Sequence, residues 1–498
     1  MNNLKPEKVF RYFKEICQIP HGSGNVDAIS DYLVAFAKEH GLWVTQDDAK
    51  NVIMIKEASA GKEESPAIMI QGHMDMVAVK EPDAAIDMKK DPLQLAVDGD
   101  YIYAKDTSLG GDDGIAIAYG LALLSDESLV LPRIELVITT DEEVGMDGAT
   151  VIDLSPCKAM MMLNIDSEEE GQFVAACAGG IRVNGSLAVT REGGCCEKKS
   201  GCDSIEAVSY YKYKVMLTGF MGGHSGTEIG KHSGNANKVM GWFLEKMRKE
   251  VDIKIVGLQG GEKDNAIPLE AEAVVCVKAD QIDQFESVCK KLEEEMQKAY
   301  EATDPDCKVM IRREEICCEN ADAECAWISD KDFDAILALL NEAPNGVQKM
   351  SEELPGLVQT SLNLGIMKMD KTEFQVAFSL RSSVADEKTE LIDKVCGVIE
   401  KYQGTVSTTS DYPAWEYKKE SPLRDHMVAV YEKQYGKKPE VLSLHAGLEC
   451  GILADKRPGL DCVSFGPDIL DIHTTRERMS ISSVQRTWEF LLEVVQTL

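Results

Sequence analysis

The chain has 498 residues, of which 85 are Asp or Glu and 53 are Lys or Arg, so its formal net charge is −32. This acidic balance repels phosphate backbones and anionic lipid surfaces, and it therefore argues against nucleic acid and membranes as partners. The length exceeds the roughly 100 to 200 residues that one hydrophobic core organises, so we expect two or more domains.

The N-terminal segment predicts a first helix rather than a signal peptide. Charged and apolar residues alternate at helical spacing over residues 1–20, without a long apolar core or a small-residue cleavage site. No window of the sequence reaches the roughly 18 uninterrupted apolar residues that a spanning helix needs. The fifteen cysteines are scattered and lack the spacing of a disulfide framework. We therefore expect a cytoplasmic protein with reduced thiols.

Short apolar runs alternate with helical runs from the start of the chain to about residue 166. The short runs predict strands at 51–56, 67–77, 133–140 and 159–166. Residues 114–126 form an apolar run that is too long for a strand, and they predict a helix. This alternation is typical of an α/β domain with a mostly parallel sheet.

The composition changes around residues 190–213, where Gly, Cys and charged residues indicate an exposed connection. The chain beyond it predicts a β-α-β-β-α-β order, with elements at 211–219, 234–250, 251–261, 271–279, 284–302 and 307–315. Another boundary is expected near residue 412. The predicted organisation is therefore an α/β domain in two parts, 1–186 and 412–498, with an α+β domain at 187–411 inserted between them.

Chemically active residues follow the first of the predicted strands. His73 and Asp75 lie two residues apart at the carboxyl end of strand 67–77, so their side chains point to the same side. Open α/β sheets bind their ligands at this edge. Taken alone, however, a His-x-Asp pair is common and does not predict a metal site.

Further acidic residues end other predicted elements of the same domain. Asp112 and Asp113 precede the helix at 114–126, three acids at 141–143 follow strand 133–140, and Asp166 closes strand 159–166. Each pattern alone has an ordinary explanation, as a helix cap or a solvated acidic turn. Together they crowd one sheet edge with carboxylates that would repel one another unless cations lay among them. A metal site is the interpretation we favour.

The expected ligands suit divalent zinc, with manganese or cobalt as alternatives. Carboxylates with one or two histidines are typical of such ions, and the carboxylates are too many for a single four-coordinate ion. Two ions sharing a bridging carboxylate would use them. A second histidine is then needed, and the C-terminal segment 466–475 offers His473.

The ordered motifs of the whole chain resemble the di-zinc aminoacylase and carboxypeptidase-like metallopeptidases, in their aminoacyl-histidine dipeptidase (Xaa-His dipeptidase, carnosinase-like) branch. The motifs are, in chain order, IPHGSGN, QGHMDMV, LGGDDGIAIA, DEEVGMDGA, NIDSEEEG, CAGG, GGHSGTEI with GNANK, NAIP, TSLNLG, SLRSS, HAGLECG and GPDILDIHT. GGHSG, SLNLG and HAGLECG are the ones that point to the dipeptidase branch rather than to a deacylase.

The resemblance implies a ligand set for two divalent metal ions. One ion would be bound by His73, Asp112 and Asp166, and the other by Asp112, Glu143 and His473, with Asp112 bridging. Asp75 would accept the remaining ring N–H of His73 and fix its orientation, as a metal-bound imidazole generally requires. Glu142 would be the general base that activates water for attack on a peptide carbonyl.

The resemblance also implies roles for residues outside the metal ligands. Residues 187–411 would form an enlarged lid domain whose His224 donates to the oxyanion. Asn265 and Arg381 would hold the free carboxylate of the substrate, Arg because its planar fork donates to both oxygens. His445 and Gly447 would line the substrate pocket.

The expected activity is hydrolysis of unblocked dipeptides such as β-alanyl-histidine. A tripeptidase or an N-acyl amino acid deacylase would share all the metal ligands and is the alternative within the class. A catalytically silent binding scaffold is the alternative from another class. The resemblance further implies a homodimer. The segment with Cys195, Cys196 and Cys202 has no counterpart in the family. We interpret it as a flexible insertion, with binding of a separate metal ion or oxidation of its thiols as the alternatives.

Overall fold

The computed structural model describes residues 4–192, 210–314, 326–352 and 356–498, and Cys195, Cys196 and Cys202 lie outside these ranges. The chain forms two compact units, one made of 1–177 with 415–498 and the other of 178–414. The boundary predicted at 186 falls inside β9 (Gly179–Ala188), and the one at 411 falls inside β19 (Thr405–Tyr412). Both strands belong to the sheet of the second unit, and the units divide just outside them.

The first unit contains a mixed sheet with the strand order β1-β2-β6-β3-β7-β21-β8-β20. The pairings of β3 with β6, β3 with β7 and β7 with β21 are parallel, whereas β1 and β2 add antiparallel at one side. The strands are β1 (Trp43–Gln46), β2 (Val52–Lys56), β3 (Ile68–His73), β6 (Ile134–Thr139), β7 (Met161–Asn164), β8 (Gln172–Cys177), β20 (Glu440–Leu444) and β21 (Asp461–Ser464). The predicted α/β fold is confirmed.

Helices pack against this sheet and complete the core of the first unit. They are α1 (Glu7–Ile16), α2 (Asp27–Glu39), α3 (Gly111–Ser125), α4 (Glu142–Gly145), α5 (Asp147–Val151), α11 (Pro422–Tyr435), α12 (Glu449–Lys456) and α13 (Ile481–Thr497). A smaller sheet joins β4 (Leu95–Asp98), β5 (Tyr101–Ala104), β22 (Ile469–Leu470) and β23 (Arg478–Ser480) in the order β22-β23-β5-β4. The C-terminal segment is thereby tied to strands from the first hundred or so residues.

β3 and β6 carry apolar residues on both faces because both strands are buried along their whole length. Gly72 on β3 allows the neighbouring helix α3 to pack closely against the strand. A Cβ at this position would lie 2.5 Å from Cβ of Ala116 and 2.4 Å from Oδ2 of Asp113, so only glycine allows α3 to approach β3 this closely. The close approach brings the start of α3 to the carboxyl end of β3.

The second unit contains an antiparallel sheet with the order β14-β11-β13-β12-β17-β18-β9-β19, and β16 pairs with β17. Besides β9 and β19, its strands are β11 (Tyr210–Thr218), β12 (Lys254–Gly260), β13 (Ala271–Lys278), β14 (Lys308–Glu314), β16 (Gly346–Met350), β17 (Val358–Met369) and β18 (Glu373–Ser382). A short pair joins β10 (Arg191–Glu192) to β15 (Trp327–Ile328).

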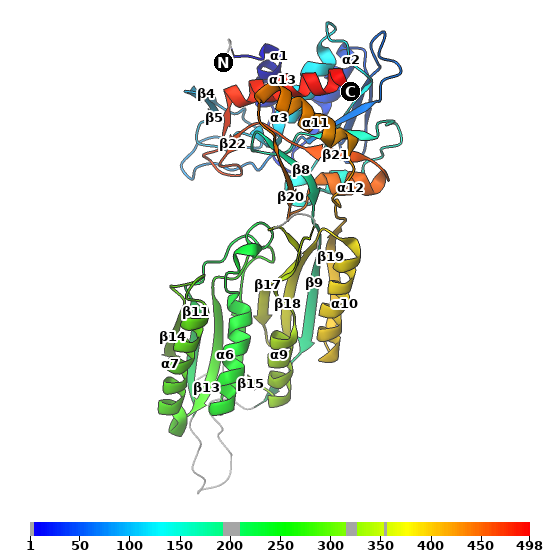
Figure 1. Cartoon of the computed structure of the whole chain (residues 1–498). Helices are drawn as coiled ribbons and strands as arrows, with labels where there is room; N and C mark the ends of the chain where they lie inside the picture. Colours follow the sequence, from blue (N-terminus) through cyan, green and yellow to red (C-terminus); the bar gives the residue numbers. More distant parts are fainter. Residues whose placement is uncertain (1–3, 193–209, 315–325, 353–355) are drawn as a thin grey trace. The chain divides into compact units, whose positions relative to one another are not determined.

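Helices cover one face of this second sheet (Figure 1). They are α6 (Ala236–Glu250), α7 (Ile282–Ala299), α9 (Asp330–Glu342) and α10 (Ala385–Lys401). Their apolar faces and the inward residues of the strands form one hydrophobic cluster, separate from the core of the first unit. The inserted α+β domain predicted from the sequence is thus present. Within the described ranges, no helix has both the length and the hydropathy to cross a membrane.

Candidate functional site

The carboxyl ends of three neighbouring strands carry most of the predicted metal ligands. His73 is the last residue of β3, Glu143 lies in α4 directly after β6, and Asp166 follows β7. Asp112 stands in the first turn of α3, and His473 lies in the loop between β22 and β23. The structure brings all five side chains together in two groups.

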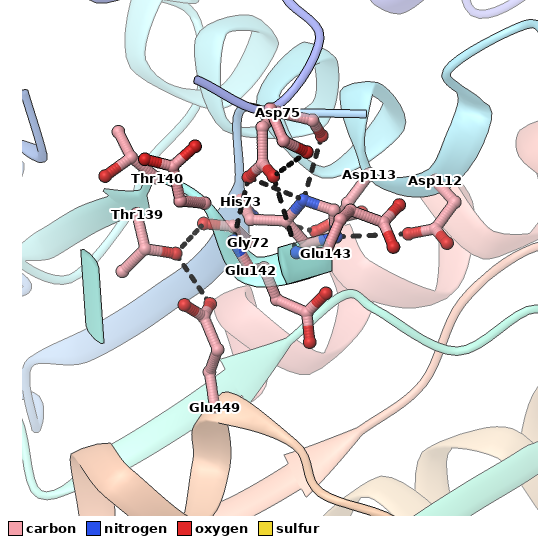
Figure 2. A network of polar contacts seen from close by, with 12 residues as sticks. Gly72, His73, Asp75, Asp112, Asp113, Thr139, Thr140, Glu142, Glu143 and Glu449 are labelled. Atoms are coloured by element: carbon pink, nitrogen blue, oxygen red, sulfur yellow. Dashed lines mark hydrogen bonds and ion pairs between the residues drawn. The ribbon is translucent and has the colours of Figure 1, made fainter. Parts of the chain in front are cut away.

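The two groups share the carboxylate of Asp112, whose oxygens face different histidines. Oδ1 lies 3.1 Å from Nε2 of His73, and Oδ2 lies 3.1 Å from Nε2 of His473. Asp166 completes the first group, with Oδ1 3.5 Å from Nε2 of His73, and Glu143 completes the second, with Oε2 2.9 Å from Nε2 of His473. Within each group the ligand atoms lie within 4.8 Å of one another, a spacing that could hold a metal ion. Figure 2 shows His73, Asp112 and Glu143 from close by.

The electrostatics of these groups fit cations. Burial would lower the pKa of His73, but the carboxylates of Asp112 and Asp166 raise it well above its usual value. Burial, with Asp112 and Glu143 nearby, raises the pKa of Asp166 to about 6. Oε1 of Glu143 is buried and has no hydrogen-bond partner among the described residues. Carboxylates held in this way leave charge and lone pairs that divalent ions would satisfy.

Asp75 contacts His73 through both its backbone oxygen and its carboxylate. Nδ1 of His73 lies 3.0 Å from the backbone oxygen of Asp75 and 3.5 Å from its carboxylate, so the backbone is the nearer acceptor. The carboxylate accepts hydrogen bonds from Oγ of Ser23 and the backbone N–H groups of Glu142 and Glu143. Burial would raise the pKa of Asp75, but the hydrogen bonds from His73, Ser23 and Glu142 lower it.

Glu142, the predicted base, lies beside the two groups on α4. Burial raises the pKa of its carboxyl well above the usual value, and the neighbouring carboxylates of Asp166, Glu449 and Glu143 raise it further. A carboxylate whose pKa is raised takes up a proton more readily near neutral pH, as a general base must. The position and the electrostatics of Glu142 therefore suit proton transfer.

Two buried acidic residues that were not predicted from the sequence support the site by accepting hydrogen bonds from the segments that carry it. The first is Glu477. Glu477 accepts backbone N–H groups of Leu109, Gly110 and Gly111 over 2.8, 3.1 and 2.8 Å, and so fixes the loop that presents Asp112. Its neighbours at 476 and 478 are arginines, and such a run of charged residues is typical of a solvated turn. No local signal marks Glu477 as buried.

The second such residue, Glu449, begins α12 and is fully buried. Its Oε2 accepts hydrogen bonds of 2.6 Å from both Oγ1 of Thr139 and Nε2 of Gln71, and Gln71 in turn accepts one of 2.6 Å from Asn164 (Figure 2 shows Glu449 and Thr139). This network crosses β6, β3 and β7 at their carboxyl ends, because Thr139 and Asn164 are the last residues of their strands and Gln71 lies two residues before the end of β3. It thereby fixes the strands relative to one another.

The second unit brings together His224 and Asn265. Their backbones are adjacent, because the N–H of Ser225 donates to the oxygen of Asn265 over 2.8 Å and a β-bridge joins His224 to Ala266. Both residues line one cavity of about 650 Å³. Asn363, a residue of the TSLNLG motif, donates to the backbone oxygens of Asp264 and Ala266 and so holds this loop.

The environment of His224 favours one neutral form of its ring. Burial and the cation of Arg381 lower its pKa, so the imidazole is uncharged at neutral pH. The backbone N–H of Thr227 donates to Nδ1 over 3.3 Å. Because Nδ1 accepts, the ring proton resides on Nε2, which is then a neutral hydrogen-bond donor.

Arg381 lies near His224 in the second unit and is 8% exposed. Its Nη1 donates to the phenol oxygen of Tyr412 over 2.9 Å. Among the residues that the structure describes, it forms no ion pair with an acidic side chain, and its Nε has no hydrogen-bond partner. A buried guanidinium in this state is suited to bind an anionic ligand.

The remaining predicted residues lie in the first unit. His445 is buried just after β20, and Gly447 is half-buried just before α12. The two are not part of either group of ligand atoms.

Sequence and structure comparisons identify the family. The model of peptidase family M20/M25/M40 matches residues 69–497. The chain belongs to this family. It is similar to the cytosol non-specific dipeptidase of Escherichia coli strain K12, with 33% identity over 496 residues, which cover 100% of this chain and 98% of the relative.

Solved structures of the family resemble the whole chain. The aminoacylhistidine dipeptidase from Vibrio alginolyticus matches with a TM-score of 0.88 and 33% identity, over 100% of this chain and 98% of that one. A tripeptidase from Staphylococcus aureus matches with a TM-score of 0.56 and 16% identity, over 99% and 98% of the two chains. The latter likeness concerns the fold alone. The sequence-based assignment to a metallopeptidase family is confirmed.

Proposed function

We propose that this peptidase is a metal-dependent dipeptidase that cleaves unblocked dipeptides, including Xaa-His. The observation that carries the proposal is the carboxylate of Asp112, whose two oxygens face His73 and His473 at equal distances of 3.1 Å. Two relatives at 33% identity are named as dipeptidases, which supports the same substrate class.

Two divalent ions, zinc in our proposal with manganese or cobalt as alternatives, would be held by His73, Asp112 and Asp166 and by Asp112, Glu143 and His473. Such ions lower the pKa of a bound water and polarise the carbonyl that it attacks. The donor set of carboxylate oxygens and imidazole nitrogens fits these ions, and Asp112 would hold both.

Glu142 would move the proton. Its carboxylate would take a proton from the attacking water and return it to the leaving amine nitrogen. Asp75 would hold Glu142 in place through the backbone N–H that its carboxylate accepts. The raised pKa of Glu142 supports the second half of this cycle, because the protonated carboxyl must persist until the amine departs.

The second unit would act as the lid domain and bind the substrate. Nε2–H of the neutral His224 would donate to the oxyanion that develops on the peptide carbonyl. Arg381 and Asn265 would hold the C-terminal carboxylate of the dipeptide. In the first unit, His445 and Gly447 would line the substrate pocket.

Metal analysis coupled to a substrate panel tests this proposal. The purified protein is assayed for bound metals and then incubated with dipeptides that include β-alanyl-histidine, with tripeptides and with N-acetylated amino acids. We expect two ions per chain and cleavage of unblocked dipeptides that stops on chelation and returns with zinc. Cleavage of acetylated substrates only would indicate a deacylase, and cleavage of tripeptides only a tripeptidase. A metal-loaded protein that cleaves none would be a binding scaffold.

We extend the proposal to location and assembly. The name of the Escherichia coli relative supports a cytosolic location. The homodimer implied by the family resemblance is tested by light scattering of the purified protein, where a monomeric mass would contradict it.

A further inference from the structure

Arg381 belongs to a row of three residues that crosses adjacent strands of the second unit. It pairs with Gly180 across β18 and β9, and Gly180 pairs with Tyr412 across β9 and β19. Residues paired in this way point to the same face of a sheet. Arg381 and Tyr412 are therefore on one face, with the glycine between them.

Gly180 leaves the space that the tyrosine ring occupies. A Cβ at this position would lie 2.3 Å from the phenol oxygen of Tyr412 and 2.4 Å from Cζ of its ring. The ring thus lies across the glycine backbone, and its oxygen reaches the next strand but one. There it accepts the hydrogen bond of 2.9 Å from Nη1 of Arg381.

A β-bulge in β19 determines that a tyrosine, and not an acid, stands opposite Gly180. Thr409 pairs with Arg182 and Tyr412 with Gly180, so β19 has one more residue than β9 over this stretch. Ser410 in the bulge has a φ of 54°, in the left-handed region. Without the extra residue, Asp411 would pair with Gly180 beside Arg381.

Asp411 is instead directed to another cation. Its carboxylate forms an ion pair of 2.6 Å with Nζ of Lys388 and is largely exposed. Arg381 consequently keeps a neutral hydroxyl as its partner, and the charge of the guanidinium is not cancelled by an acid of the described chain. A buried Arg oriented by a neutral acceptor can give its remaining donors to a bidentate carboxylate.

We propose that Tyr412, seated across Gly180, is a positioning residue that orients Arg381 for the C-terminal carboxylate of the substrate. This inference rests on the proposed function, because it presumes a dipeptide with a free carboxylate. It adds a residue that determines how strictly the enzyme requires an unblocked C-terminus.

Steady-state kinetics of the metal-loaded full chain test the inference, with alanyl-histidine as substrate. Tyr412→Phe removes only the hydroxyl, and we expect KM to rise about tenfold with kcat nearly unchanged, as for a lost hydrogen bond to a charged group. Tyr402→Phe is the matched control. It removes a hydroxyl that donates to Glu342 in the same unit, and KM should stay at the wild-type value.

A double-mutant cycle separates positioning from a merely structural role. In an Arg381→Ala background, Tyr412→Phe should change KM by less than about twofold, because its effect passes through the guanidinium. An equal rise in KM in both backgrounds, a fall in kcat alone, or no change in KM would overturn the inference while the dipeptidase activity stands. A wild-type protein that cleaves no dipeptide would overturn the proposed function and this inference with it.

Discussion

The carboxylate of Asp75 accepts the backbone N–H of Glu142 over 3.1 Å, and its second oxygen accepts Oγ of Ser23 over 2.8 Å. The backbone oxygen of the same residue lies 3.0 Å from Nδ1 of His73. One residue therefore fixes both the proposed base and a proposed metal ligand, through different atoms. Its side chain supports the base, and its backbone oxygen is the nearer of its acceptors for the ligand.

Asp75→Asn is expected to lower kcat without removing the metals. The amide oxygen can replace only one of the two carboxylate oxygens as acceptor, so the start of α4 loses part of its support. We expect kcat to fall about 10- to 100-fold, as for other residues that support a metal site without binding the ion. Metal content should stay at the wild-type value, because the backbone oxygen still faces His73. Ser23→Ala, which removes a single donor to the same carboxylate, should have a much smaller effect, and an unchanged kcat in Asp75→Asn would contradict the role.

Glu142→Gln is expected to separate catalysis from metal binding. The amide cannot take up a proton, so turnover should fall by about two to four orders of magnitude. The metal stoichiometry measured by atomic absorption should not change, since Glu142 belongs to neither group of ligand atoms. Asp112→Asn provides the contrast, because it weakens both groups at once. A Glu142→Gln enzyme with wild-type turnover would remove this residue as the base.

His224→Ala is expected to lower kcat by about two orders of magnitude if Nε2–H donates to the oxyanion. His232→Asn is the control, because His232 is an exposed histidine on the same unit with a φ of 59°, which asparagine tolerates. Its kinetics should match the wild type. Should His224→Ala alter only KM, the residue would bind the ground state of the substrate instead.

Glu449 is expected to make stability depend on pH. Burial raises its pKa from 4.5 to about 8, with the charge of Asp166 adding to the shift. The folded chain thus binds a proton that the unfolded chain releases between these values. Stability is greatest below pH 4.5 for this group and falls by up to about 1.4 kcal/mol per pH unit as the pH rises towards 8.

Glu449→Gln removes this titration and keeps a side chain of the same shape. Denaturant unfolding of both proteins at pH 5, 6, 7 and 8 measures the effect, since the other ionisable groups are common to both. We expect the variant to gain stability relative to the wild type across this range. Parallel stability curves would show that Glu449 keeps one protonation state throughout.

The sequence allowed the central strands and the residues that end them to be predicted. The runs at 67–77, 133–140 and 159–166 correspond to β3, β6 and β7, because fully buried strands are continuous apolar runs. Since parallel strands end at one sheet edge, the convergence of His73, Asp166 and the acids at 141–143 followed from the pattern, whereas the choice of Glu143 among these acids came from the family resemblance. His473 was proposed because a second histidine was needed, and the family resemblance assigned it to the second ion.

The supporting contacts could not be predicted, because they join segments far apart in the chain without a periodic signal. Glu477 contacts a backbone loop some 366 residues earlier, and Glu449 contacts Gln71 across 378 residues. The partner of Arg381 depends on a one-residue bulge, and strand patterns do not reveal which residue a bulge displaces. Geometry of this kind is determined by tertiary packing rather than by local preference.

Asp112 and His473, which share the second group of ligand atoms, are separated by 361 residues. A chain that has emerged from the ribosome only as far as the inserted unit carries Asp112 and Glu143 but lacks His473. The group is completed only after residue 473 has been made and β23 pairs with β5. A nascent chain at that stage would therefore contain every residue of the first group of ligand atoms, but only two of the three residues of the second.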